Sequence, residues 1–395
     1  MRRSLILTLA LLFGGTLAPS YCALDPSYLT DLTDDQQGDR QIEKEFRIAA
    51  GHKLDFDLKT GGSIDITGWD GELVSVRVHL DGRDWQDCQI TFNESASGLQ
   101  ILSDYTSGKR SHATDLKFEV KVPKRFNLGF DTMGGSIKIS DIEGQIKGKT
   151  MGGGYTLKNL KGELDLLTMG GGITLTNSDV NGEVKTMGGE VLIKDVIGNV
   201  KGSSMGGNVI YQNVTNRRGE TTGDEVRIST MGGEIKVEDA PAGADVMTMG
   251  GDINIGTVGD HVRAKTMGGD INIEAVDGWV QATTMAGDVA VRMVGNPDQG
   301  RRDVTITSYS GDVTLTVPAG LSMEFDIELA ETKNSDRSYR IISDFEVQQR
   351  ESDRWDQDNG TPRKYIYGTG SVAGGRNKIK IRTINGNVYL KRGNI

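Results

Sequence analysis

The chain has 395 residues, of which 55 are acidic and 45 basic, and it contains 54 glycines but only 7 prolines. The acidic balance argues against phosphate backbones and anionic membrane surfaces as partners, because both need basic patches. Two cysteines are too few for a disulfide framework. Glycine is about twice as frequent as in an average protein, and its recurrence at fixed offsets favours turn-rich β structure over disorder.

Residues 1–23 are typical of a signal peptide. A positive start precedes an apolar run, residues 5–13, that is too short to span a bilayer. Cys22 is not expected to carry a lipid, because the bulky Tyr21 stands where a lipid-attachment signal has a small residue. The mature protein is expected to be exported, to the periplasm, the outer cell surface or the medium, and to have no transmembrane segment.

Residues 24–45 are polar and acidic, and they are expected to form a flexible or weakly helical lead-in. A β pattern begins at Phe46. Residues 54–58 alternate apolar and polar with a period of two, as a half-buried strand does. Residues 46–130 are therefore expected to form irregular N-terminal β coils, which continue into the repeats that follow.

The tetrapeptide Thr-Met-Gly-Gly, or a close variant, recurs along residues 131–323. Its nine methionines are spaced 18 positions apart, except for one interval of 26. They are Met133, Met151, Met169, Met187, Met205, Met231, Met249, Met267 and Met285. A fixed period of this size is typical of a stacked-repeat protein.

Each repeat carries two short runs of β-branched residues separated by glycine turns. One repeat cannot bury its apolar face alone, but stacked repeats can, with strands about 4.8 Å apart. The sequence therefore predicts an all-β fold, a single-stranded parallel β-helix or β-solenoid with 18-residue coils. A left-handed hexapeptide helix also fits an 18-residue coil, but it needs an aliphatic residue at every sixth position. Apolar residues here stand four, six, nine and thirteen positions after each Met, which favours a right-handed or flattened coil.

Two repeats are longer than the others. Eight extra residues lie within residues 213–224, and six lie around residues 295–302. These insertions are expected to be surface loops, where function most often resides. Residues 324–395 are expected to form C-terminal β coils with a charged insertion, residues 335–363, and a last coil that caps the open edge of the stack.

The segment at residues 60–70, Thr-Gly-Gly-Ser-Ile-Asp-Ile-Thr-Gly-Trp-Asp, opens the pattern, and residues 383–390, Thr-Ile-Asn-Gly-Asn-Val-Tyr-Leu, close it. Together with the internal Thr-Met-Gly-Gly units, they resemble the bacterial β-strand-repeat putative adhesins, a family built on a domain of unknown function. The resemblance covers residues 46–395. It implies a β-helical, exported or surface protein, and it offers no catalytic residues to transfer.

The methionine ladder has two interpretations. Thioethers favour Cu(I), but copper sites gather His and Cys together with Met, and histidine is almost absent from the repeats. Met also fills irregular parts of a core. We therefore expect the motif to be the corner of each coil, with Met packed into the core and glycine supplying backbone freedom. The first glycines of these corners are Gly134, Gly152, Gly170, Gly188, Gly206, Gly232, Gly250 and Gly268.

An acidic residue follows the glycine pair in the C-terminal half of the repeats. These residues are Glu234, Asp252, Asp270, Asp288 and Asp312. Stacking would place them in one column, where solvent or a bridging cation such as Ca²⁺ relieves their repulsion. The spacing of a calcium β-roll is missing, so a solvated turn edge is favoured over a cation or ligand column.

The sequence favours a binding protein over an enzyme. The four histidines are scattered, and most coils are too short to build the groove of a polysaccharide lyase or hydrolase. We expect a non-enzymatic adhesin or cell-envelope scaffold without a cofactor, whose partner is a cell-surface glycan or an envelope protein. The alternative is a carbohydrate-active β-helix enzyme, in which Asp298, Arg301 and Arg302 of one loop contact a sugar. End-to-end assembly through uncapped coils is a third hypothesis.

Overall fold

A computed structural model describes residues 40–109, 111–215, 225–335, 337–357 and 360–393 of the chain. The expected signal peptide, and residues 24–39 of the expected lead-in, lie outside the described residues. Regular structure in the described part is β-strand throughout, apart from one short 3₁₀ helix, η2 (Trp85–Asp87). No helix in this part is long and apolar enough to cross a membrane. The predicted all-β class is confirmed.

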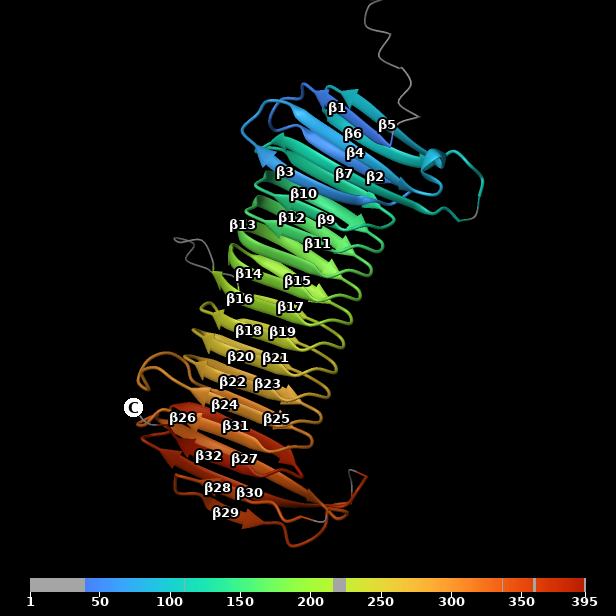
Figure 1. Cartoon of the computed structure of the whole chain (residues 1–395). Helices are drawn as coiled ribbons and strands as arrows, with labels where there is room; N and C mark the ends of the chain where they lie inside the picture. The colour runs from blue at the N-terminus through green and yellow to red at the C-terminus, as the bar shows by residue number, and fades with distance from the viewer. Residues whose placement is uncertain (1–39, 110, 216–224, 336, 358–359, 394–395) are drawn as a thin grey trace, which may run out of the picture. The chain divides into compact units, whose positions relative to one another are not determined.

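The repeats form coils that stack on one another, and each coil adds one strand to each of two parallel ladders (Figure 1). The strands of ladder A end at the threonine or serine of the repeat or one residue before it: β8 (Asn127–Thr132), β10 (Glu143–Thr150), β12 (Lys161–Thr168), β15 (Val200–Ser204), β17 (Val226–Ser229), β19 (Ala244–Met247), β21 (His261–Lys265), β23 (Trp279–Thr284) and β25 (Val304–Ser308). The strands of ladder B follow the glycine pair: β9 (Ile137–Ser140), β11 (Tyr155–Lys158), β14 (Val191–Ile197), β16 (Val209–Thr215), β18 (Ile235–Ala240), β20 (Ile253–Val258), β22 (Ile271–Val276), β24 (Val289–Met293) and β26 (Val313–Val317). One long strand, β13 (Ile173–Thr186), turns the corner and belongs to both ladders.

The pairing between coils confirms the 18-residue period. Tyr155 pairs with Ile137 on one side and with Ile173 on the other, and each partner is one full period away along the chain. Across the longest repeat, Val209 still pairs with Ile235, so the extra residues leave the ladders without changing the register. The β-solenoid prediction is therefore confirmed, whereas the handedness of the coil stays a prediction.

The core lies between the two ladders. Along each strand, alternate side chains point inward, as the period of two requires. In one coil, Ile253 and Ile255 of ladder B and Val262 and Ala264 of ladder A are all buried. β-Branched residues fit this pleated, closely packed interior, and each coil completes its burial only against its neighbours.

A second corner connects ladder B to ladder A, and the sequence analysis did not identify it. Its residues have positive φ values of 49–61° and recur every 18 positions: Asp141, Asn159, Asn177, Asp195 and Asn213. Asn and Asp tolerate this left-handed conformation better than other non-glycine residues. The Asn159 side-chain amide also donates to the Asp141 carboxylate at 3.0 Å, which joins two coils. The recurring Asn or Asp was the signal that could have located this corner.

The N-terminal coils extend both ladders and then end them with antiparallel strands. In ladder A, β2 (Lys53–Leu58) and β6 (Gly98–Tyr105) continue the parallel pairing, and β5 (Cys88–Ser95) follows antiparallel. In ladder B, the order is β3 (Ser63–Trp69), β7 (Thr114–Pro123), β4 (Val74–Gly82) and β1 (Gln41–Phe46). The strand β1 corrects the expectation of a flexible or weakly helical lead-in for residues 41–45. The open edge of β4 supplies hydrogen-bond partners for this segment, and Ile42 and Phe46 pack against the core.

The last coil in sequence is not the last coil of the stack. Its strands β31 (Asn377–Ile384) and β32 (Val388–Arg392) lie inside the ladders, because β27 (Met323–Thr332) and β28 (Ile341–Ser343) pair beyond them. Outside β27 come β30 (Arg363–Val372) and β29 (Gln348–Glu351), both antiparallel to their neighbours. The expectation that the last coil in sequence caps the open edge of the stack is therefore wrong. β30, which follows the charged insertion, covers the edge of β27 in ladder A, and β29 from the insertion covers the edge of β30.

Candidate functional site

The threonine of each Thr-Met-Gly-Gly corner is buried, and in most coils its hydroxyl joins neighbouring coils. Thr150 Oγ1, by contrast, has no hydrogen-bond partner. Thr248 Oγ1 donates to the Gly233 carbonyl of the preceding coil at 2.9 Å and accepts from the Gly251 amide of its own coil at 3.3 Å. Ser204 makes the same two bonds in another coil. A hydroxyl at this position therefore satisfies a carbonyl and an amide that the turn would otherwise leave unpaired.

The two glycines of the corner have different constraints. A Cβ added to the second glycine, Gly251, would lie 2.1 Å from the carbonyl oxygen of Gly233 in the preceding coil, whereas a Cβ on the first, Gly250, would have no atom closer than 3.6 Å. Ala286 already occupies the first position in one coil. The expectation of backbone freedom is corrected for this coil, because Gly251 lies outside the left-handed region. The need for glycine at the second position is steric, since the backbones of stacked corners touch.

The methionine between the threonine and the first glycine of each corner points into solvent, which contradicts the expectation that it packs in the core. The nine ladder methionines are between 39% and 60% exposed. Elsewhere in the chain, Met293 and Met323 are buried in the interior, so this protein does use Met as a core filler at other positions. At the corner the backbone turns away from the core after the buried threonine, and the next side chain therefore faces outward.

The predicted acidic column is present, and its members are bonded to the backbone. Asp252 Oδ1 accepts from the Asp270 amide at 2.8 Å, and Asp270 Oδ1 accepts from the Asp288 amide at 2.7 Å. The column continues through Asp312 to the Asn387 amide. Within the described ranges, no group of three or more His, Cys, Asp or Glu side chains is arranged to hold a metal ion. These carboxylates thus link successive coils, and a cation column stays a prediction.

The insertion around residues 295–302 is organised by a buried arginine. The Arg302 guanidinium donates to the carbonyls of Val294, Asn296 and Gln299 and pairs with the Asp277 carboxylate. Its side chain is only 2% exposed. The hypothesis that Arg302 contacts a sugar is therefore wrong, because its donors are directed into its own loop. The insertion within residues 213–224 lies mostly outside the described residues.

A cluster of aromatic and basic side chains lies on the outer face of ladder A beside this loop. The Trp279 ring stacks on the His261 ring, with centroids 4.9 Å apart, and the guanidiniums of Arg263 and Arg301 lie 4.9 and 5.2 Å from the Trp279 centroid. His261 bridges Asp260 and Glu225 at 2.8 and 2.5 Å. We call Arg263, Trp279 and Arg301 the Trp279 cluster.

The charges around the Trp279 cluster are paired to different degrees, and Arg301 Nε donates to Asp303 Oδ2 at 2.7 Å. Burial opposes ionisation of Glu225, but hydrogen bonds from His261 and Arg227 outweigh it and lower the pKa of this carboxyl group. Arg263 lies 3.8 Å from Glu225 and 3.9 Å from Asp245 and stays 47% exposed. Sequence analysis had singled out Arg301 but missed Arg263 and Trp279. The signal was available, because Trp279 is the one tryptophan in residues 131–323.

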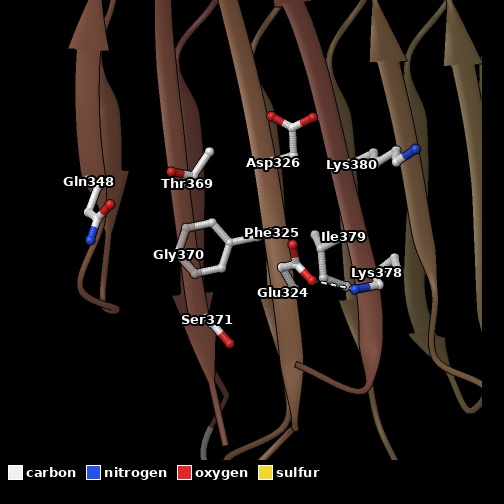
Figure 2. Close-up of a pocket in the computed structure, with 10 residues that line it drawn as sticks. All are labelled: Glu324, Phe325, Asp326, Gln348, Thr369, Gly370, Ser371, Lys378, Ile379 and Lys380. Carbon is white, nitrogen blue, oxygen red and sulfur yellow. Dashed lines mark hydrogen bonds and ion pairs between the residues drawn. The ribbon is translucent and has the colours of Figure 1, made fainter. Parts of the chain in front are cut away.

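Two depressions of the described surface are lined by acidic and basic side chains. Figure 2 shows one of about 500 Å³ over β27, β30 and β31, lined by Glu324, Asp326, Lys378 and Lys380 among others. The hydrogen bond from Lys378 lowers the pKa of Glu324, so this carboxylate is not suited to act as a general acid. The second depression, of about 490 Å³, lies over β2, β8 and β10.

One serine has the sequence spacing of a nucleophile elbow. Residues 202–206 read Gly-Ser-Ser-Met-Gly, the Gly-x-Ser-x-Gly pattern of many hydrolases. Ser204 is nevertheless buried, and its hydroxyl is used in the corner bonds to Gly189 and Gly207. It is therefore a structural residue of the repeat, equivalent to the threonine of other coils.

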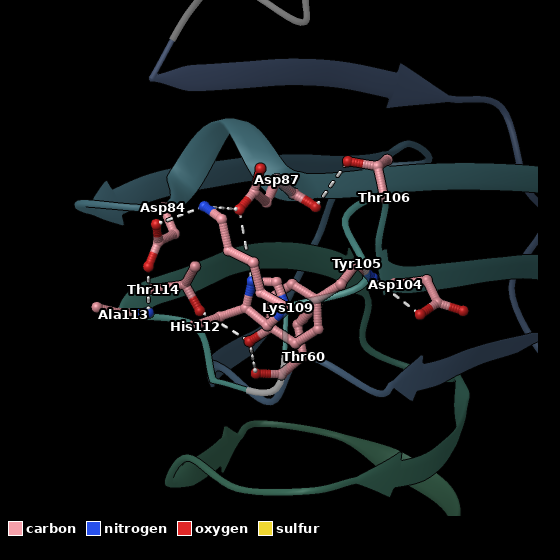
Figure 3. Close-up of polar contacts among 10 residues, drawn as sticks. All are labelled: Thr60, Asp84, Asp87, Asp104, Tyr105, Thr106, Lys109, His112, Ala113 and Thr114. Atoms are coloured by element: carbon pink, nitrogen blue, oxygen red, sulfur yellow. Dashed lines mark hydrogen bonds and ion pairs between the residues drawn. The ribbon is translucent and has the colours of Figure 1, made fainter.

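A second polar cluster lies near the N-terminal end of the ladders (Figure 3). Lys109 Nζ binds Asp84 at 3.0 Å and Asp87 at 2.7 Å. The nearly buried His112 ring stacks on Tyr105 with centroids 3.7 Å apart. Hydrogen bonds from the Ala113 amide and Lys109 lower the pKa of Asp84, and the hydrogen bond from Lys109 lowers that of Asp87. This cluster ties η2 to the loop before β7.

Comparisons with known proteins match the chain to a family and to several solved folds. The model of the Toastrack DUF4097 family matches residues 53–391. No match is found among curated proteins. A putative cell adhesion protein from Clostridium sporogenes is 10% identical, with a TM-score of 0.20 over 89% of this chain and 100% of that chain. A putative adhesin from Parabacteroides merdae is 17% identical, with a TM-score of 0.33 over 65% of this chain and 98% of that chain. A putative lipid binding protein from Parabacteroides distasonis is 14% identical, with a TM-score of 0.34 and the same two coverages.

Proposed function

This chain belongs to the Toastrack DUF4097 family, and we propose that it is an exported, non-enzymatic binding protein of the adhesin type that holds an acidic glycan at the cell envelope. The observation that supports this proposal is the Trp279 cluster. Two guanidiniums and an indole project there from neighbouring coils of a ladder whose backbone is held by continuous strand pairing.

The chemistry of the Trp279 cluster suits a sugar that carries carboxylate or sulfate groups. A guanidinium is a planar fork of donors that matches such groups with two parallel hydrogen bonds. Arg263 and Arg301 are 47% and 65% exposed, so their donors are accessible. Arg263 contacts its acidic neighbours Glu225 and Asp245 only at 3.8 and 3.9 Å, whereas Arg301 donates to Asp303 at 2.7 Å. An anionic ligand on Arg301 therefore competes with the Asp303 carboxylate, and one on Arg263 does not have to displace a close partner.

The rigidity of the ladder supports binding over catalysis. The coils carry their outward side chains at fixed strand spacing, about 4.8 Å, which suits recognition of a repeating polymer. A glycosidase needs one carboxyl group that stays protonated near neutral pH. Glu225, beside the Trp279 cluster, and Glu324, in the depression over β27, both have lowered pKa values. These observations favour a non-enzymatic role.

A glycan array probed with the protein from residue 24 onward tests the proposal. We expect retention on uronic-acid or sulfated glycans, weakened by salt, and little retention on neutral ones. Arg263→Gln combined with Arg301→Gln should lower this binding at least about tenfold, whereas Arg292→Gln, on the outer face of ladder B, should not change it. If the double variant binds the glycans as well as Arg292→Gln does, the Trp279 cluster is not the binding site. Cleavage of a bound glycan would instead support the carbohydrate-active enzyme.

A further inference from the structure

The ladder methionines are the feature that neither the fold nor the proposed function explains. A buried Met would be explained by core packing, but these nine side chains lie outside the core. The position itself does not require Met, because Tyr309 occupies it in the coil that follows Met285. An uninterrupted row of solvent-exposed thioethers therefore calls for a different account.

Strand pairing places these thioethers one above another. The Met169 amide donates to the Thr150 carbonyl of the preceding coil, and the Met187 amide donates to that of Thr168, at 3.0 and 3.1 Å. The coil with the long insertion keeps the row intact, since the Gly232 amide donates to the Met205 carbonyl at 3.1 Å. Neighbouring Met backbones are thus separated by the strand spacing, about 4.7–4.9 Å.

We propose that this row, Met133 to Met285, binds soft monovalent cations, Cu(I) or Ag(I), with each ion held between the thioethers of neighbouring coils. A zinc–thiolate bond is about 2.3 Å long, and bonds of about this length on opposite sides of one ion place two sulfurs about 4.6 Å apart. That separation matches the strand spacing. Met has three rotatable bonds, so each thioether reaches this geometry without a change in the backbone.

The surroundings of the row favour soft ions over hard ones. Thioethers are ligands for Cu(I) and its relatives, whereas carboxylates and carbonyls suit Mg²⁺ and Ca²⁺. The carboxylates of Glu234, Asp252, Asp270 and Asp288 follow the same corners three residues later. Asp252 and Asp270 accept hydrogen bonds from backbone amides of the next coil. The negative charge of these carboxylates lowers the electrostatic potential along this edge, and the lower potential attracts cations. Histidine is almost absent from the repeats, so thioethers alone hold the ions in this proposal.

Silver titration of the mature protein tests the proposal, because Ag(I) needs no reductant. In chloride-free buffer we expect about four ions per chain by native mass spectrometry and calorimetry, with micromolar or tighter affinity. Changing Met231, Met249, Met267 and Met285 to Leu should lower this capacity by about half. The melting temperature should stay the same, because these side chains are exposed.

Met247 provides a matched control. Its side chain is 47% exposed, as in the row, but it is the last residue of β19, and its partners in the neighbouring coils are Ser229 and Lys265 rather than methionines. Met247→Leu should keep the full silver capacity. The proposal is overturned if the fourfold variant retains the wild-type capacity, or if the wild-type protein binds Ag(I) only at the millimolar concentrations expected of isolated thioethers. Because glycan binding uses ladder A, either result leaves the proposed function untouched.

Discussion

Three of the four residues of each corner occupy three different environments. The threonine hydroxyl is buried between coils, the methionine is in solvent, and the second glycine lies against the carbonyl of the preceding coil. A repeat that looks uniform in sequence therefore divides into residues that hold the stack and one residue that is free to bind. The two predictions at this scale separate these roles.

Replacing the hydroxyl should destabilise the stack. Thr248→Val keeps the shape of the side chain but leaves the Gly233 carbonyl and the Gly251 amide without their partner. The expected loss is about 1–3 kcal/mol of unfolding free energy for a buried group left unsatisfied, measured by urea unfolding. Thr248→Ser is the control and should stay close to wild type, because Ser204 already makes these bonds in another coil. Equal midpoints for both variants would contradict the prediction.

The two glycines should differ in their tolerance of a methyl group. Gly251→Ala forces a Cβ to within 2.1 Å of a backbone oxygen, and overpacking of this kind costs about 2 kcal/mol or more. Gly251→Val, the larger change, should be worse. Gly250→Ala meets no atom closer than 3.6 Å and should lie within about 0.5 kcal/mol of wild type. Thermal melts of Gly251→Ala and Gly250→Ala test this prediction. A larger loss of stability for Gly250→Ala than for Gly251→Ala would contradict it.

At the scale of single elements, the ends of the ladders depend on contacts that lie outside the repeat. Antiparallel strands β1, β4 and β5 end the ladders at one end of the stack, and β29 and β30 end ladder A at the other. These strands do not carry the 18-residue pattern. They are held by backbone pairing and by local polar clusters such as the one around Lys109.

The Lys109 cluster should make the N-terminal coils sensitive to acid. The pKa values of Asp84 and Asp87 are lowered in the folded protein, so their contribution to stability is present above the ordinary aspartate pKa of about 3.9. It is lost as the pH falls through the lowered native values. The double variant Asp84→Asn, Asp87→Asn should be less stable than wild type at pH 7, and the difference should disappear in strong acid. A constant difference in urea midpoint at every pH would count against this mechanism.

At the scale of the whole described solenoid, stability should depend on complete coils. Deleting residues 152–169 joins Met151 to Gly170 and removes β11 and β12 together, which leaves the remaining coils in register. We expect a folded β protein with a modestly lower urea midpoint, because each coil contacts only its neighbours. Deleting residues 152–160 removes only β11, and it should abolish cooperative unfolding or cause aggregation. Circular dichroism and urea titration of both deletions provide the test.

The 18-residue period was sufficient to predict the all-β class, the coil length and the parallel stacking, whereas the family was predicted from the resemblance of the motifs at residues 60–70 and 383–390 and of the Thr-Met-Gly-Gly units. Each coil must travel the same path to present its strands to the next, so an arithmetic regularity in the sequence follows directly from the geometry of the stack. The same regularity pointed to Thr-Met-Gly-Gly as a corner. The predicted β class, coil length, stacking and corner can be read from composition and spacing, because neither requires knowledge of which distant segments pair.

Only the tertiary structure decided which way the corner side chains face and which residues meet. Methionine is apolar, and the sequence predicted it to be inside, but the backbone path after the buried threonine turns it outward. The place of the last coil inside the ladders, and the meeting of Arg263, Trp279 and Arg301, depend on pairing between segments far apart in the chain. Such contacts are set by which strand edges remain open once the coils have stacked, and no local pattern in the sequence records that.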